Sequence, residues 1–123
     1  MKVLALDYGR ARTGVAVSDP TGELARPLET VERAATDTGL DRLAAIVAEE
    51  QAEKVVVGLP LTLKGEYGEQ ARETERFVAT LRARLEVPVE LFDERFTSVL
   101  ADGDDARAAA HLLSDYLRWS KES

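Results

Sequence analysis

Residues 2–19, KVLALDYGRARTGVAVSD, decide how the rest of the chain can be arranged. Two apolar runs, VLAL and TGVAV, flank a short loop that contains glycine. Such runs predict two strands joined as an antiparallel hairpin. Asp7 ends the first run, where a buried strand would reach the surface. A carboxylate is costly to bury without a partner, and a hard cation such as Mg²⁺ or Mn²⁺ is a natural partner.

Asp7 also fits a simpler interpretation, because Asp-Tyr-Gly can form an ordinary turn at the start of a hairpin. The metal interpretation therefore depends on whether other acidic residues reach the same point.

The composition is that of a single domain covering residues 1–123. Hydrophobic residues make up 45% of the chain, which is enough for a core, and there is no cysteine to form disulfides or thiolate metal sites. With no apolar run of membrane-spanning length and no signal-peptide pattern, we expect a cytoplasmic protein without a membrane partner.

The formal net charge of −7 argues against a surface that attracts nucleic acid everywhere. A local nucleic-acid site remains compatible with it. Acidic residues that bind cations count as negative in the sum, yet together with those cations they present a neutral or positive surface to a phosphate.

The remaining pattern predicts a third strand within residues 23–33, placed at a sheet edge because Pro27 lacks a backbone donor. After it, helical and strand periodicities alternate. Helices are expected from about residue 37, over 69–85 and over 104–119, and strands over 54–60 and 89–92. This order predicts an α/β fold with a five-stranded mixed sheet: an antiparallel meander of three strands, then strand–helix–strand units with helices packed on the sheet.

Three carboxylates occupy equivalent places in this order. Asp7 ends the first strand, Glu94 follows the fifth and Asp105 opens the last helix. If the first, fourth and fifth strands are parallel neighbours, their carboxyl ends share one edge, where ligand sites collect in open α/β sheets. Two cations held there could activate a water and stabilise the leaving oxygen of a phosphodiester.

Each acid also has an alternative role. Glu94 could pair with Arg95, and Asp93 is equally available at that place. Asp104 and Asp105 are both good helix N-caps, a role that needs no metal. The sequence by itself therefore leaves the acidic site as a hypothesis.

Four ordered blocks carry a family resemblance. LALDYGRARTGVAVSD, VVVGLPLTLKGEYGEQA and DERFTS closely resemble the three signature blocks of the YqgF/RuvX family, and DARAAAHLLSDYL resembles its fourth block. That family is similar to the RuvC resolvases and has a ribonuclease H-like fold. The resemblance implies a metal-dependent nuclease that acts in 5′-end processing of pre-16S rRNA, with ribosome assembly particles as possible partners. A Holliday junction resolvase-like DNA endonuclease is the alternative that the family suggests.

The resemblance also implies roles for individual residues. The catalytic and metal-binding acids that match the family, holding two Mg²⁺ or Mn²⁺ ions, are Asp7, Glu94 and Asp105. Asp104 lies one residue out of that register. The loop cations placed to contact phosphates are Arg10, Arg12, Lys64 and Arg95, and a planar guanidinium suits bidentate phosphate contact.

The chain departs from the family in one place. Only residues 99–104, VLADGD, separate DERFTS from the final helix, where the family has a longer basic helix and loop. This is either a real deletion or a missing stretch of sequence, and the match of Asp105 to the family's last-helix acid spans it.

Several questions stay open at this level. Pre-rRNA and branched or single-stranded DNA are both possible substrates, and monomer and homodimer are both possible states. A protein of the same fold that binds nucleic acid without cutting is a further alternative. An actin-like ATPase is disfavoured because 123 residues leave no second lobe.

Four further residues have expected roles. Tyr8 and Tyr67 could stack on unpaired bases or be neutral loop residues. Gly9 and Gly14 are expected to let the first hairpin turn and pack closely.

Overall fold

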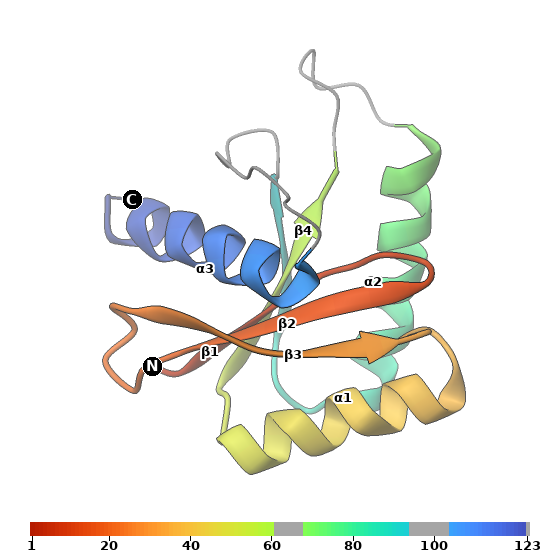
Figure 1. Ribbon diagram of the computed structural model, residues 1–123, viewed down its shortest axis with the longest axis horizontal. Coiled ribbons are helices and arrows are strands. Elements are labelled where there is room, and N and C mark those ends of the chain that lie inside the picture. The colour runs from red at the N-terminus through yellow and green to blue at the C-terminus, as the bar shows by residue number, and fades with distance from the viewer. Residues whose placement is uncertain (61–67, 94–103, 123) are drawn as a thin grey trace.

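A computed structural model describes residues 1–60, 68–93 and 104–122 of the chain (Figure 1). The eight elements follow the predicted order of three strands and then alternating helices and strands. They are β1 (Val3–Asp7), β2 (Arg12–Ser18), β3 (Ala25–Glu32), α1 (Asp37–Glu50), β4 (Lys54–Leu59), α2 (Glu69–Arg84), β5 (Val89–Asp93) and α3 (Asp105–Glu122).

The five strands form one mixed sheet in the order β3-β2-β1-β4-β5. β1, β2 and β3 are antiparallel neighbours, and β1, β4 and β5 run parallel. This confirms the predicted fold class. Pro27 lies on the edge strand β3, opposite Ala16, where the register of the β2–β3 pair shifts. An edge position tolerates proline because its missing N–H would have faced away from the sheet.

The sheet is covered on both faces, by α3 on one side and by α1 and α2 on the other (Figure 1). Each face has its own hydrophobic core, and the alternation of strand residues divides β1 between them. Leu4 and Leu6 pack on the α1 and α2 side, whereas Val3 and Ala5 pack on the α3 side. Continued alternation assigns Asp7 to the α3 side of the sheet.

Local hydrogen bonds define both ends of α1. Thr36 caps α1 by accepting a hydrogen bond from the backbone N–H of Gly39, at 3.2 Å, and Gln51 ends the helix in the left-handed conformation. The predicted inner face of α3 is buried throughout. Its members are Ala106, Ala109, Ala110, Leu113, Tyr116 and Leu117. Three alanines in this set let the helix backbone approach the sheet closely.

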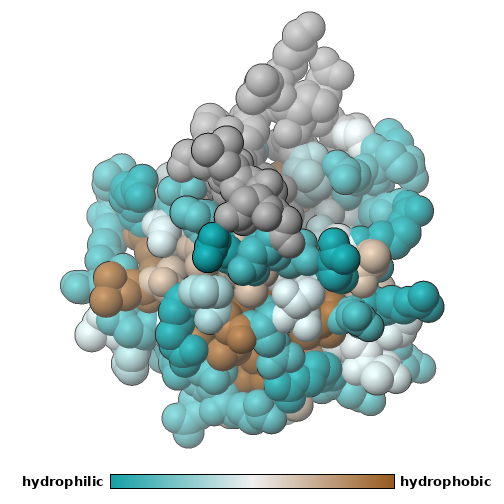
Figure 2. Space-filling model, viewed as in Figure 1, coloured by the Kyte–Doolittle hydropathy of each residue, from teal (hydrophilic) through white to brown (hydrophobic). Residues whose placement is uncertain are grey.

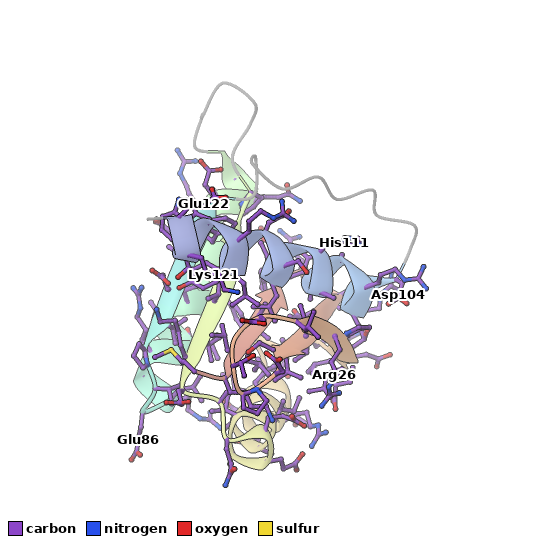
Figure 3. All side chains as sticks on the ribbon, turned by 90° about the vertical axis from the view of Figure 1, so that its left-hand side faces the viewer. Arg26, Glu86, Asp104, His111, Lys121 and Glu122 are labelled. Carbon is purple, nitrogen blue, oxygen red and sulfur yellow. The ribbon has the colours of Figure 1, made fainter. Side chains whose placement is uncertain are left out.

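The outer surface is mainly polar, as the face in Figure 2 shows. Figure 3 shows α3 running from Asp104 at one end to Glu122 at the other, and His111 is exposed along it. The helices of the described residues are too short or too polar for one to cross a membrane.

Candidate active site

The carboxyl ends of the three parallel strands lie at one edge of the sheet. Leu6 pairs with Val57 on β4, and β4 in turn ends opposite Asp93 on β5. Asp7 and Asp93 therefore end their strands at the same edge, as the parallel arrangement requires. Glu94, the second predicted acid, follows Asp93 directly in the sequence but lies outside the described residues.

Gly14 links Asp7 to the start of α3. Gly14 pairs with Asp7 across the β1–β2 ladder. A Cβ atom built at Gly14 would overlap the backbone carbonyl of Asp105, so only glycine leaves room for α3 to begin here. The absence of a side chain on β2 thus brings the first residue of α3 against the strand pair that carries Asp7.

The structure gives Asp104 and Asp105 different roles. The Asp104 carboxylate accepts a hydrogen bond from the backbone N–H of Arg107 at 3.1 Å, which is the geometry of an N-cap. Asp105 is the first helical residue, and its carboxylate accepts from Arg12 Nε at 2.9 Å. Capping therefore accounts for Asp104, whereas the Asp105 carboxylate pairs with Arg12, the first residue of β2.

Both arginines of the first loop contact carboxylates. Arg12 pairs with Asp105, and Arg10 forms an ion pair and hydrogen bond with Glu73 of α2. The Arg12 side chain is 62% exposed and that of Arg10 is 80% exposed. Exposed ion pairs contribute only about 0–1 kcal/mol, so a phosphate could displace either carboxylate. The predicted phosphate contacts of these arginines remain predictions.

Two of the three predicted acids are present in the described part of the chain. Their carboxylate oxygens are the ligands that Mg²⁺ and Mn²⁺ prefer, and the cationic Arg12 already neutralises Asp105. Within residues 1–60, 68–93 and 104–122, no three acidic or histidine side chains are grouped closely enough to hold a metal. Lys64, Glu94 and Arg95 fall outside those ranges.

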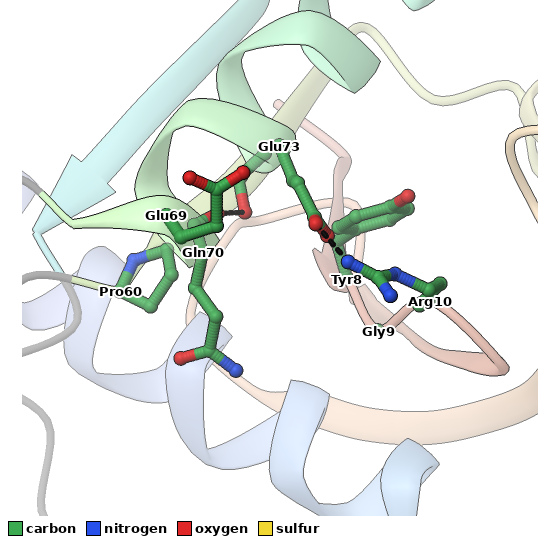
Figure 4. Close-up of a pocket in the computed structure, with 8 residues that line it drawn as sticks. Tyr8, Gly9, Arg10, Pro60, Glu69, Gln70 and Glu73 are labelled. Atoms are coloured by element: carbon green, nitrogen blue, oxygen red, sulfur yellow. Dashed lines mark hydrogen bonds and ion pairs between the residues drawn. The ribbon is translucent and has the colours of Figure 1, made fainter.

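Tyr8 lies on the opposite side of the same edge from Asp7. Its ring stacks on Phe77 of α2 with centroids 4.2 Å apart and planes 18° apart. Burial and the nearby Glu73 carboxylate raise the pKa of Tyr8, so its hydroxyl stays protonated at neutral pH. Figure 4 shows the hollow beside it, about 410 Å³ in volume, with Arg10 pointing toward Glu73.

Sequence reasoning missed two parts of this site. The first is Glu73, which looked like one charge of an amphipathic helix but holds Arg10. The second is that Gly14 gives α3 the space to begin; close packing at Gly14 was predicted, but its partner was not. Neither partner has a local signal, because each is distant in sequence.

The family model described as "Holliday junction resolvase", RuvX, matches residues 1–119. A relative in Chloroflexus aggregans, named "Putative pre-16S rRNA nuclease", is 48% identical over 130 residues, covering 94% of this chain and 92% of that protein. A relative of the same name in Thermobifida fusca is 51% identical over 100 residues, covering 80% of this chain and 62% of its own. The aligned length in the first case exceeds the 123 residues of this chain, so that relative carries an insertion.

Solved structures agree on the fold. Thermus thermophilus RuvC in complex with a Holliday junction substrate superposes with a TM-score of 0.64 at 16% identity, covering 100% of this chain and 97% of that one. Fowlpox virus resolvase with Holliday junction DNA gives a TM-score of 0.50 at 11% identity, covering 98% and 96%. The sheet and helices therefore have a ribonuclease H-like arrangement. The relatives' names and this fold together support a hydrolytic nuclease.

Proposed function

Because the chain belongs to the RuvX family, we propose that it is a divalent-metal-dependent nuclease whose site lies at the carboxyl edge of β1, β4 and β5. Asp7, Glu94 and Asp105 are the proposed catalytic residues and ligands of two Mg²⁺ or Mn²⁺ ions. The proposed phosphate-binding residues are Arg10, Arg12, Lys64 and Arg95.

One observation carries the proposal. Asp7 and Asp105 are far apart in sequence, yet the start of α3 lies against Gly14, the ladder partner of Asp7. Two carboxylates at one sheet edge repel each other unless positive charge lies near them. Arg12 supplies such a charge to Asp105 in this structure, and a divalent cation would supply more.

In this proposal the acidic residues and the arginines have different functions. The three acids would hold the cations, which when bound lower the pKa of an attacking water and offset charge that develops on the phosphate. Arg12 would leave Asp105 and turn to the substrate, where its guanidinium can contact two phosphate oxygens at once. Arg10 would do the same from the other side of the loop, in exchange for Glu73.

The proposed substrate is the 5′ region of pre-16S rRNA, processed in the cytoplasm on ribosome assembly particles. It rests on the names of the relatives, at up to 51% identity. Branched DNA is the second candidate, favoured by the description of the family model and by the likeness to RuvC bound to a junction. A junction resolvase needs two active sites and thus a homodimer, whereas an rRNA-processing enzyme can act as a monomer.

Cleavage assays with both substrates test the proposal. We expect Mn²⁺- or Mg²⁺-dependent cleavage of a pre-16S 5′ RNA fragment or of a four-way DNA junction, abolished by EDTA and by Asp7→Asn. Asp41→Asn is the matched control, because Asp41 is 70% exposed on α1, on the other layer of the molecule. Cleavage by Asp7→Asn at the wild-type rate would contradict the role of Asp7. Binding without cleavage at saturating Mn²⁺ would indicate a non-cleaving protein of the same fold.

A further inference from the structure

The surface around Tyr8 differs from the rest of this acidic protein. Two adjoining hollows, of about 500 Å³ and 260 Å³, share Tyr8 and Arg10 in their linings. The larger also contains Arg33, and the smaller contains Arg76. Three arginines face these hollows against one acid, Glu73, although the whole chain carries a net charge of −7. We call the surface formed by Tyr8, Arg10, Arg33 and Arg76 the arginine surface.

The arginine surface has an aromatic ring at its centre. Tyr8 stacks on Phe77 almost in parallel, with 4.2 Å between centroids. Tyr8 also lines the larger hollow, which Phe77 does not border. A planar group bound in that hollow would therefore contact Tyr8 without displacing Phe77. Cations around an open aromatic ring are the combination that binds single-stranded nucleic acid, through backbone charge and base stacking.

Arg33 on this surface has a backbone conformation that is unfavourable for arginine. Its φ angle is +47°, in the left-handed region that glycine and asparagine adopt more easily than arginine. Its backbone is fixed to the first loop, because its N–H donates to the Ala11 carbonyl at 2.9 Å. Arg33 is exposed, and it lines the larger hollow together with Arg10 and Ala11 of the first loop.

The neighbouring hollow, drawn in Figure 4, has a more acidic lining than the two hollows of the arginine surface. It also contains Tyr8 and Arg10, but its other charged lining residues are Glu69 and Glu73. Two carboxylates against one arginine would repel a phosphate backbone. The electrostatics therefore favour a strand passing over the α1 side of Tyr8, between Arg33 and Arg76, and disfavour the start of α2.

We propose that the arginine surface binds a single-stranded segment of nucleic acid, with an unpaired base stacked on Tyr8 and phosphates on Arg33 and Arg76. This rests on the proposed nuclease function for its biological meaning. Because Asp7 and Tyr8 are consecutive, a strand bound at Tyr8 would lie close to the edge of the sheet at which β1 ends. The substrate class it assigns is nucleic acid with an unpaired segment beside the cut.

The charge part of the proposal is tested by binding without cleavage. A labelled, unstructured RNA or DNA oligonucleotide is titrated in EDTA at several salt concentrations. Each phosphate contact to a single strand contributes about 0.7 to the slope of log K against log salt. Arg33→Asn and Arg76→Ala should each lower the slope by about that amount. Asparagine tolerates the left-handed backbone, so Arg33→Asn should melt no lower than wild type.

Arg26→Ala is the matched control. Arg26 is an arginine with a 61% exposed side chain at the opposite end of β3 from Arg33. It should leave the salt slope unchanged. If Arg33→Asn and Arg76→Ala gave the same slope as Arg26→Ala, the arginine surface would not bind the backbone and the proposal would be wrong.

The stacking part is tested with Tyr8→Leu, which keeps an apolar side chain against Phe77 but removes the ring. We expect single-strand affinity to fall about tenfold with the salt slope unchanged, because stacking involves no ion release. A blunt duplex of the same sequence should bind more weakly than the single strand, since its bases are not free to stack. Wild-type affinity in Tyr8→Leu, or equal binding of duplex and single strand, would overturn the proposal.

The same proteins assayed for cleavage in Mn²⁺ separate the two proposals. If the wild type cleaves but the variants show no binding defect, the proposal of the arginine surface is wrong and the proposed nuclease function stands. If the wild type binds single strands and the variants show the predicted defects, but the wild type does not cleave, the proposed nuclease function is wrong and the proposal of the arginine surface stands. Running RNA and DNA oligonucleotides in parallel shows which of the two strands the surface prefers.

Discussion

Gly14 and the backbone of Asp105 occupy adjoining space, so that the helix α3 begins where a side chain on β2 would otherwise lie. Gly14 is also the ladder partner of Asp7. The position of Asp105, a predicted ligand, thus depends on a residue that has no chemistry of its own.

Gly14→Ala should therefore damage both stability and the site. The new Cβ would overlap the Asp105 carbonyl, which is backbone and cannot rotate away. Overpacking of this kind typically costs about 1–3 kcal/mol, to be measured by denaturant unfolding. Gly68→Ser is the control, because nothing lies within 4 Å of a Cβ there and serine can cap α2. Equal stability of Gly14→Ala and wild type would show that α3 can shift without cost.

Asp104 and Asp105 should respond differently to the same change. Asparagine is as good an N-cap as aspartate, so Asp104→Asn should keep both stability and cleavage. Asp105→Asn should lose metal-dependent cleavage while melting close to wild type, because only an exposed ion pair is removed. Cleavage assays and thermal unfolding of the two variants provide the comparison. Loss of activity in Asp104→Asn with activity retained in Asp105→Asn would reverse the assignment.

Arg12 should compete with metal for Asp105. An exposed ion pair is worth about 0–1 kcal/mol, so Arg12→Gln should tighten Mn²⁺ binding by up to about fivefold, while weakening binding of the nucleic acid. A Mn²⁺ titration without nucleic acid measures the first effect. Arg10→Gln is the control, because Arg10 pairs with Glu73, which is not a predicted ligand. Weaker Mn²⁺ binding by Arg12→Gln would mean that Arg12 orients Asp105 instead of competing for it.

The pair between Glu29 on β3 and Arg42 on α1 should make stability depend on acid pH. Arg42 donates to both carboxylate oxygens, at 2.9 and 2.6 Å, and this lowers the pKa of Glu29. A carboxylate whose pKa is lowered by folding stabilises the protein above its unfolded pKa of about 4.3 and loses that contribution as pH falls through the folded pKa. Both side chains are about a third or more exposed, so we expect at most about 1 kcal/mol.

Unfolding of Glu29→Gln and wild type at pH ~7 and pH ~3 measures this dependence. The stability difference should be present at the higher pH and shrink at the lower one. Glu86→Gln is the control: Glu86 is exposed and projects away from the body of the protein in Figure 3. A difference between Glu29→Gln and wild type that stays constant with pH would exclude the ion pair as its cause.

The sequence was sufficient for the elements and their order. Continuous apolar runs defined β1 and β2, helical spacing defined the inner face of α3, and Pro27 identified β3 as an edge strand. These signals are local, because side-chain period and turn chemistry depend on residues a few positions apart. Parallel pairing of β1, β4 and β5 was only a condition at the level of sequence, and the structure meets it.

The sequence also named the candidate acids, but it could not choose between Asp104 and Asp105, since both suit a helix start. Tertiary contacts distinguish the two residues: Asp104 caps the helix, and Asp105 meets Arg12, a residue 93 positions away. The same is true of Tyr8, whose stacking partner Phe77 and neighbour Arg76 come from α2 and whose neighbour Arg33 comes from the turn before α1. Local periodicity determines whether a segment forms a helix or a strand. Packing across the sheet determines which distant side chains come into contact, and these contacts are visible only in the tertiary structure.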